Sequence, residues 1–179
     1  KYRPLVTTQV SGATQLSNEG NVRKDFWLVD NNAYAKDRNV NSQTLEEHRE
    51  MRDIKGRVKH MDELEIDVQV LFPTLFLRPV TDRMEVEFAL FRSYNRWLAE
   101  IWKQAPSRMR WVAMPPLRSP FHELEKELRF CKDHGACGIF MRPFELEGNV
   151  SDPMFFPLYK LAGELDMPLC WHAGNGSFT

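Results

Sequence analysis

The sequence predicts an α/β fold in which short buried strands alternate with amphipathic helices. The last three strand segments begin about 30 residues apart, which is the length of a βα unit. Such units place their strands parallel, so the carboxyl ends of the strands share one edge of the sheet. The alternation alone fits both an open doubly wound sheet and a closed barrel. The apolar strand segments are Ile66–Phe72, Arg110–Met114, Cys137–Met141 and Pro168–Trp171.

Length and composition indicate a globular domain. The chain has 179 residues, 42% hydrophobic and 27% charged, which is enough for one domain with its own core. A formal net charge of -1 gives no electrostatic case for nucleic acid, and no apolar run approaches the roughly 20 residues of a membrane helix. Three cysteines without a Cys-x-x-Cys pair favour a reducing compartment, so we expect the cytoplasm. Because the first residue is Lys1 rather than Met, we expect a fragment or a processed product.

Residues 1–45 are predicted to be an irregular amino-terminal segment, and residues 46–179 to form the main domain. Turn-forming pairs such as Ser11-Gly12 and Asn31-Asn32 interrupt the first part of the chain. Phe26–Val29 fits either a short strand or an apolar plug. A loop of this length inside a compact domain is unusual and often functional.

The first predicted helix leads directly into the first strand. Apolar residues recur there at steps of three and four, which is the period of a helix with one buried face. The β-branched content of Ile66–Phe72 and the proline at Pro73 indicate a buried strand and its end. The helical apolar residues are Met51, Ile54, Val58, Met61 and Leu64.

The second predicted helix has the clearest signals at its ends. Thr81 or Asp82 can cap its start, and Glu85 stands three residues after Asp82, as in a capping box. Ala105-Pro106 ends it, and the second strand follows. Its apolar face contains Val86, Leu90, Tyr94, Trp97, Leu98 and Ile101.

Two further helices start with a capping residue followed by proline. Ser119-Pro120 and Asp152-Pro153 each place the proline at the first helical position. His134-Gly135 ends the earlier helix, with glycine supplying a left-handed cap, and Met167-Pro168 ends the later one. The third and fourth strands follow these two ends.

His172 is the first candidate functional residue, because it comes directly after the fourth strand. A neutral imidazole at that edge of the sheet can bind a metal ion, or it can simply bond a loop carbonyl. A catalytic metal takes three or more protein ligands, and the sequence has neither a His-x-His pair nor a His-Glu-x-x-His motif. The other histidines fall on helices or helix ends and are expected to be solvated: His48, His60, His122 and His134.

Arg142, Thr74 and Arg78 are candidates for substrate binding, because they also follow strand ends. A guanidinium group at that edge of the sheet can bind a carboxylate through two hydrogen bonds. Arg142 can equally form an ion pair with Glu145 or Glu147. Thr74 and Arg78 carry the same ambiguity between a binding role and an ordinary surface role.

Six blocks of the sequence stand in a characteristic order and spacing: His60–Leu71, Asn95–Leu98, Arg108–Pro115, Gly135–Ile139, Ser151–Pro153 and Trp171–Gly174. Together they resemble the amidohydrolase-related metal-dependent hydrolases, a family that includes aminocarboxymuconate-semialdehyde decarboxylase and several aromatic acid decarboxylases. The longest block, His60–Leu71, is similar to the family sequence MDELGIDVQVL. The ordered set is more specific than any single block.

The resemblance implies a (β/α)8 TIM barrel with a divalent metal at its carboxyl edge, zinc being the expected ion. The strands above then correspond to barrel strands two to five, so residues 46–179 form a partial barrel. His172 matches the metal-binding histidine that ends the family's fifth strand. The first-strand His-x-His pair is missing, and the later catalytic histidine and metal-binding aspartate are expected beyond Thr179. Glu65 stands where the family often has glycine, and a left-handed backbone there costs on the order of 1 kcal/mol.

These features favour a metal-dependent hydrolase or nonoxidative decarboxylase that acts on a small carboxylate or cyclic substrate. Arg142 and Arg78 are then candidates to clamp the substrate carboxylate. An alternative is a non-catalytic half-barrel that binds a partner chain over its open sheet edges. An unrelated open α/β binding domain is the third hypothesis. The expected partners are a small-molecule substrate and, as an open option, further copies of the chain, without nucleic acid or membrane.

Overall fold

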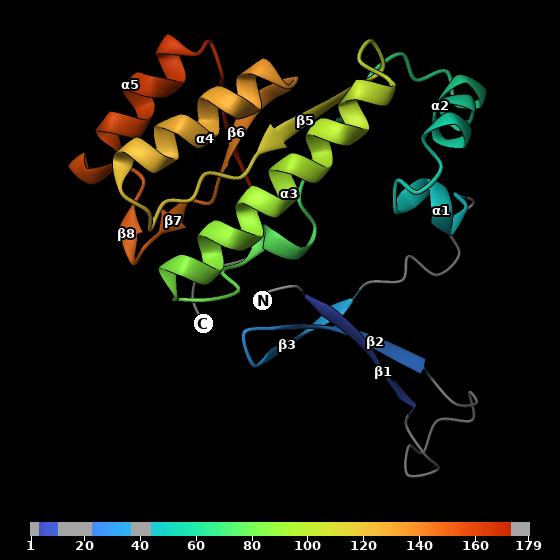
Figure 1. Cartoon of the computed structure of the whole chain (residues 1–179), viewed down its shortest axis with the longest axis horizontal. Helices are drawn as coiled ribbons and strands as arrows, with labels where there is room; N and C mark the ends of the chain where they lie inside the picture. The colour runs from blue at the N-terminus through green and yellow to red at the C-terminus, as the bar shows by residue number, and fades with distance from the viewer. Residues whose placement is uncertain (1–3, 11–22, 37–43, 173–179) are drawn as a thin grey trace.

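The computed structural model describes residues 4–10, 23–36 and 44–172 and shows a mixed α/β architecture (Figure 1). Its centre is a parallel sheet with the strand order β4-β5-β6-β9, so the order across the sheet follows the order along the chain. All four predicted strands are confirmed, although their ends differ from the predicted ones by up to three residues. They are β4 (Gln69–Leu71), β5 (Met109–Ala113), β6 (Ala136–Met141) and β9 (Leu169–Trp171).

Three helices cover one face of this sheet (Figure 1). They are α3 (Met84–Gln104), α4 (Phe121–Asp133) and α5 (Phe156–Glu164). Leu98 of α3 and Leu128 of α4 pack in one buried cluster with Trp111 of β5 and Met141 of β6. Burying each such side chain contributes about 1.5–3 kcal/mol, so this layer is the main source of stability.

A left-handed residue divides the first predicted helix into two. α1 (Glu46–Arg49) ends before Met51, whose φ is 54°, and α2 (Ile54–Glu63) starts afresh. Asp53 caps α2 by accepting a hydrogen bond from the Gly56 backbone N–H at 2.9 Å. The remaining short elements are η1 (Leu75–Leu77), β7 (Phe144–Glu145), β8 (Gly148–Asn149) and η2 (Pro153–Phe155).

Two predicted helix starts are wrong in detail. α3 has Arg83 as its N-cap with no capping side chain, and the Thr81 hydroxyl accepts a bond from the Arg83 backbone N–H instead. α4 has Pro120 rather than Ser119 as its N-cap. The predicted glycine end of α4 is confirmed, because Gly135 has a φ of 86° and any Cβ there would overlap the Trp102 ring.

The irregular structure predicted for residues 1–45 is wrong for the described part of that segment. β1 (Leu5–Val10), β2 (Arg23–Val29) and β3 (Asn32–Lys36) form an antiparallel sheet. Asp30 and Asn31 join β2 to β3 with φ values of 46° and 68°, as in a two-residue type I′ hairpin. The pairing of β1 with β2 spans residues 11–22, so no local pattern reveals it. The predicted turn at Ser11-Gly12 and the Ala173-Gly174 pair lie outside the described residues.

Glu65 has a φ of 56°, so the left-handed backbone considered for this position is present. Glu65→Gly is expected to raise the free energy of unfolding by about 0.5–1 kcal/mol, because glycine adopts this conformation without steric cost. Glu63→Gly, two residues earlier in α2, is the matched control and should lower stability by about 1 kcal/mol. Urea unfolding of the two variants measures both changes, and a stability loss at Glu65 would contradict the strain argument.

Candidate active site

His172 lies at the carboxyl end of β9, on the face of the sheet opposite α4 and α5. Alternate strand residues point to opposite faces, so Leu169 packs with the helix-side cluster whereas Cys170 packs with Phe140 on the other face. The His172 ring centroid is 6.0 Å from that of Phe140. Its backbone N–H donates to the Met141 carbonyl at 2.9 Å, which fixes the histidine beside the end of β6.

The Nδ1 atom of His172 is buried and has no hydrogen-bond partner among the described residues. A shielded ring nitrogen without a partner is suited to bind a metal ion or another group. Within residues 4–10, 23–36 and 44–172, however, no group of three His, Cys, Asp or Glu side chains is arranged to hold a metal. The described residues therefore supply one candidate ligand, and a catalytic metal would need further ligands from outside them.

Arg142 forms the ion pair that was the structural alternative to a substrate clamp. Its Nη2 lies 2.6 Å from Oε2 of Glu145, and its backbone N–H donates to Oε1 of the same carboxylate at 3.0 Å. Its Nη1 donates to the Phe76 carbonyl at 3.1 Å. The two side chains are only 5% and 4% exposed. The predicted clamp role of Arg142 conflicts with this arrangement, because Glu145 already occupies the place of a substrate carboxylate. Arg142 instead ties the segment after β6 to the segment after β4.

Thr74 and Arg78 flank η1 in the segment after β4, and both are exposed. Arg78 forms no ion pair with a carboxylate in the described part of the chain. Burial raises the pKa of the Tyr34 hydroxyl and the Arg78 cation lowers it, so the two side chains are close enough to interact. The substrate-binding roles of Thr74 and Arg78 stay predictions. Of the two candidate arginines, Arg78 is the one that is exposed and has no carboxylate partner among the described residues, whereas Arg142 is paired with Glu145.

A buried carboxylate that the sequence analysis missed lies near Arg142. Glu87 of α3 is 7% exposed and accepts a hydrogen bond from the Arg118 backbone N–H at 3.0 Å. Burial raises the pKa of Glu87, the contacts with Arg118 oppose this rise, and the nearby Glu145 carboxylate adds to it. The available sequence signal was its place on α3, directly after Val86 of the buried face.

Glu87→Gln is expected to become more stable relative to the wild type as pH rises from about 4 to 7. A buried carboxyl with a raised pKa contributes its stability below the ordinary glutamate pKa and loses it as pH rises through the folded value. The difference in free energy of unfolding between the two proteins should grow by at most about 1.4 kcal/mol for each unit by which the pKa of Glu87 differs between the folded and unfolded states. Urea unfolding at several pH values measures it.

Glu85→Gln on the same helix is the matched control with the opposite sign. Arg83 lowers the pKa of this exposed carboxyl through a side-chain hydrogen bond, so the wild type should gain stability relative to Glu85→Gln as pH rises. If the difference in free energy of unfolding between Glu87→Gln and the wild type stays constant with pH, burial does not raise the pKa of Glu87.

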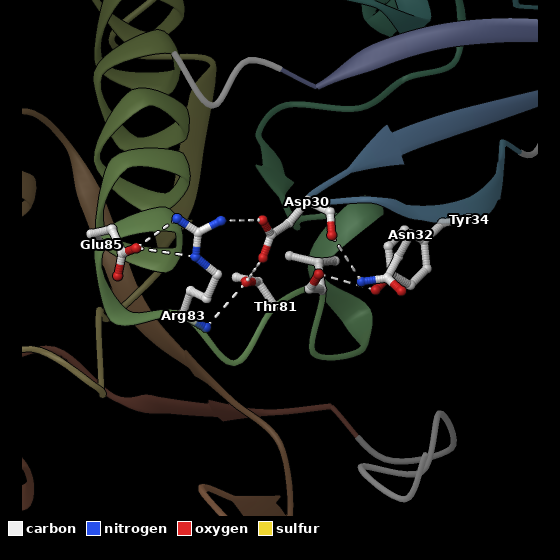
Figure 2. A network of polar contacts seen from close by, with 7 residues as sticks. Asp30, Asn32, Tyr34, Thr81, Arg83 and Glu85 are labelled. Carbon is white, nitrogen blue, oxygen red and sulfur yellow. Dashed lines mark hydrogen bonds and ion pairs between the residues drawn. The ribbon is translucent and has the colours of Figure 1, made fainter.

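The tip of the β2–β3 hairpin contacts the segment that leads into α3 (Figure 2). The Thr81 hydroxyl donates to Asp30 Oδ2 at 2.5 Å, and Arg83 Nη1 donates to Asp30 Oδ1 at 2.8 Å. The Tyr34 hydroxyl donates to the Val80 carbonyl at 3.0 Å. No local sequence pattern predicts these contacts, because an aspartate before two asparagines is typical of an ordinary turn.

Comparison with known protein families identifies the family of this chain. An amidohydrolase family model matches residues 22–179, which is most of the chain. The chain belongs to the amidohydrolase family. The family suspected from the ordered sequence blocks is therefore confirmed.

Solved structures of other amidohydrolase-fold proteins resemble this amidohydrolase chain over part of their length. The 2,6-dihydroxybenzoate decarboxylase from Rhizobium has a TM-score of 0.57 and 27% identity, covering 67% of this chain and 39% of that one. The dihydroxybenzoic acid decarboxylase from Polaromonas sp. JS666, which contains manganese and the inhibitor 2-nitroresorcinol, has a TM-score of 0.57 and 25% identity, covering 68% and 38%. The 4-oxalomesaconate hydratase from Rhodopseudomonas palustris shares the fold, with a TM-score of 0.53, 22% identity and coverage of 74% and 41%.

The amidohydrolase chain thus spans about two fifths of the length of these structures. No curated protein matches it. None of the described helices combines the length and the hydropathy required to cross a lipid bilayer.

Proposed function

We propose that this chain forms part of the active site of a metal-dependent enzyme that hydrolyses or decarboxylates a small aromatic or cyclic carboxylate. The observation that carries the proposal is His172, a half-buried histidine at the carboxyl end of β9 whose shielded Nδ1 has no hydrogen-bond partner among the described residues. The decarboxylases from Rhizobium and Polaromonas are named for dihydroxybenzoates, and the Polaromonas structure contains manganese, which supports a divalent metal and a carboxylate substrate.

The proposed architecture is a partial (β/α)8 barrel in which β4, β5, β6 and β9 are strands two to five. The sequential strand order supports this assignment, because a doubly wound sheet reverses its order at a switch point. Barrel enzymes carry their catalytic groups at the carboxyl ends of the strands. His172, Thr74 and Arg78 all follow strand ends of this sheet.

In this proposal His172 supplies one metal ligand, and Arg78 attracts the substrate carboxylate. A bound divalent metal would supply Lewis acidity for hydrolysis or orient a carboxylate for decarboxylation. The chain's own contribution is placement: the bond from the His172 backbone N–H to the Met141 carbonyl fixes the backbone that carries the imidazole, and the Phe140 ring lies beside that imidazole. The exposed guanidinium of Arg78 can form two charge-assisted hydrogen bonds with a carboxylate.

His172→Ala is expected to weaken the binding of Mn²⁺ or Zn²⁺ about tenfold, because loss of one ligand removes a metal–nitrogen bond. Isothermal titration calorimetry with each ion measures the change, and release of carbon dioxide from 2,6-dihydroxybenzoate reports activity. His122→Ala is the control, because His122 is exposed and lies on α4. Metal that binds with the same affinity to the wild type and to His172→Ala would contradict the proposal.

A second candidate function is a non-catalytic half-barrel that binds a partner chain or a second copy. Val68, Val70 and Phe72 are 49%, 44% and 46% exposed, and their alternation places them on one face at β4. Among the described residues, β4 and β9 each pair with a single neighbouring strand. Sedimentation separates the two candidates: a monomer that binds metal favours the enzyme, and a tight dimer that binds none favours the partner-binding role.

A further inference from the structure

The segment between β4 and α3 is held by side chains from two distant parts of the chain. On one side, Arg142 donates to the Phe76 carbonyl. On the other side, the β2–β3 hairpin reaches it through Tyr34 and Asp30 (Figure 2). Arg78, the candidate for carboxylate binding, lies between these two attachment points in the sequence. Because the segment is attached on both sides of Arg78, the backbone at Arg78 can move little.

The hairpin attachment has the features of a specific contact rather than a chance surface pair. The Asp30 side chain is 12% exposed and Thr81 is 8% exposed, so the carboxylate and hydroxyl meet in a shielded place. Both Asp30 oxygens accept bonds, one from Thr81 and one from Arg83, and charge-assisted bonds of this kind are about twice as strong as neutral ones. The positive φ of Asp30 belongs to the tight turn that presents this carboxylate at the hairpin tip.

A continuous set of contacts runs from this hairpin to His172. Phe76 and Phe140 pack in the same buried cluster, which also includes Val29 at the end of β2. Arg142 joins Phe76 to the end of β6, and the preceding residue, Met141, accepts the backbone bond from His172. The position of the segment after β4 relative to His172 therefore depends on contacts at both of its ends.

We propose that Asp30 is a positioning residue that latches the β2–β3 hairpin to Thr81 and Arg83 and so fixes Arg78 relative to His172. The inference rests on the proposed function, in which Arg78 recognises the substrate carboxylate. Loss of the latch leaves the metal ligand and the aromatic surroundings unchanged. It should therefore weaken recognition of the carboxylate and leave binding of the bare ring intact.

Asp30→Ala is tested by hydrogen exchange and by ligand binding. Amides of residues 75–83 should exchange faster in Asp30→Ala, while those of β5 and β6 keep their protection. Affinity for 2,6-dihydroxybenzoate should fall about tenfold, whereas affinity for resorcinol, the same ring without the carboxylate, should not change. Thr81→Val, which removes the hydroxyl at nearly constant shape, should show the same pattern at smaller size, and it stands in if Asp30→Ala does not fold.

Asn31→Gly is the matched control, because Asn31 lies in the same turn with a φ of 68° and is exposed. It should leave both measurements at the wild-type values. Unchanged exchange in residues 75–83 of Asp30→Ala would overturn the latch. Faster exchange with an unchanged preference for 2,6-dihydroxybenzoate over resorcinol would overturn the positioning role. Wild-type protein that binds resorcinol and 2,6-dihydroxybenzoate equally would refute the proposed carboxylate recognition, a result separate from the exchange measurement of the latch.

Discussion

Arg142→Ala is expected to lower the free energy of unfolding by about 3–5 kcal/mol, because it leaves the buried Glu145 carboxylate without its cation. The wild-type guanidinium lies 2.6 Å from that carboxylate, and both side chains are almost fully shielded from water. The variant also removes the donor to the Phe76 carbonyl, so the segment after β4 loses one of its attachments. The stability loss should therefore come with faster hydrogen exchange at η1.

Urea unfolding measures this loss, and two further variants fix its interpretation. Arg129→Ala removes an exposed ion pair with Glu125 on α4 and should cost less than about 1 kcal/mol. Arg142→Met combined with Glu145→Leu replaces both charges by apolar groups and should recover most of the loss. A small effect of Arg142→Ala on stability together with a large effect on substrate binding would restore the clamp role that the ion pair now argues against.

The strands were predictable because each is apolar, short and bounded by a residue that ends it. Cys137–Met141 follows His134-Gly135, and the observed β6 differs from it by one residue at its start. The amino-terminal sheet was not predictable in this way. Its hairpin turn is Asp30-Asn31 rather than Asn31-Asn32, and β3 carries two alanines that give little strand signal. β1 and β2 are separated in the sequence by residues 11–22, and pairing over this separation depends on contacts that the local sequence does not show.

The candidate site was predictable where a residue's place on a strand decides its role. His172 follows β9 as expected, but no sequence pattern could show that its Nδ1 lacks a hydrogen-bond partner among the residues that the structure describes. For Arg142 the sequence left two roles open, binding of a substrate carboxylate and an ion pair. Glu145 lies only three residues away, so an ion pair was possible, but the sequence does not show whether it forms. Asp30 and Glu87 escaped notice because their partners, Thr81 and Arg118, are 51 and 31 residues distant.

Asn95→Ala is expected to lower the free energy of unfolding by about 2–4 kcal/mol, because it leaves buried polar groups near the candidate site without hydrogen-bond partners. Asn95 is 0% exposed, and its amide makes a reciprocal pair with the Met114 backbone: Nδ2 donates to the carbonyl at 3.0 Å and Oδ1 accepts from the N–H at 2.9 Å. Its Nδ2 also donates to Glu127 at 3.1 Å. Alanine leaves both Met114 groups unpaired where water cannot reach them.

The position of Met114 gives this change a consequence beyond stability. Met114 directly follows β5. The Asn95 amide therefore binds the Met114 backbone groups at the point where the strand ends and the chain continues toward Arg118. Urea unfolding measures the loss, and faster exchange of the Met114 amide in Asn95→Ala locates it. Glu100→Ala, on an exposed position of the same helix, should change stability by less than about 0.5 kcal/mol. Equal effects of the two variants would mean that water satisfies the Met114 groups, and the carboxyl end of β5 would then be open to solvent rather than sealed by α3.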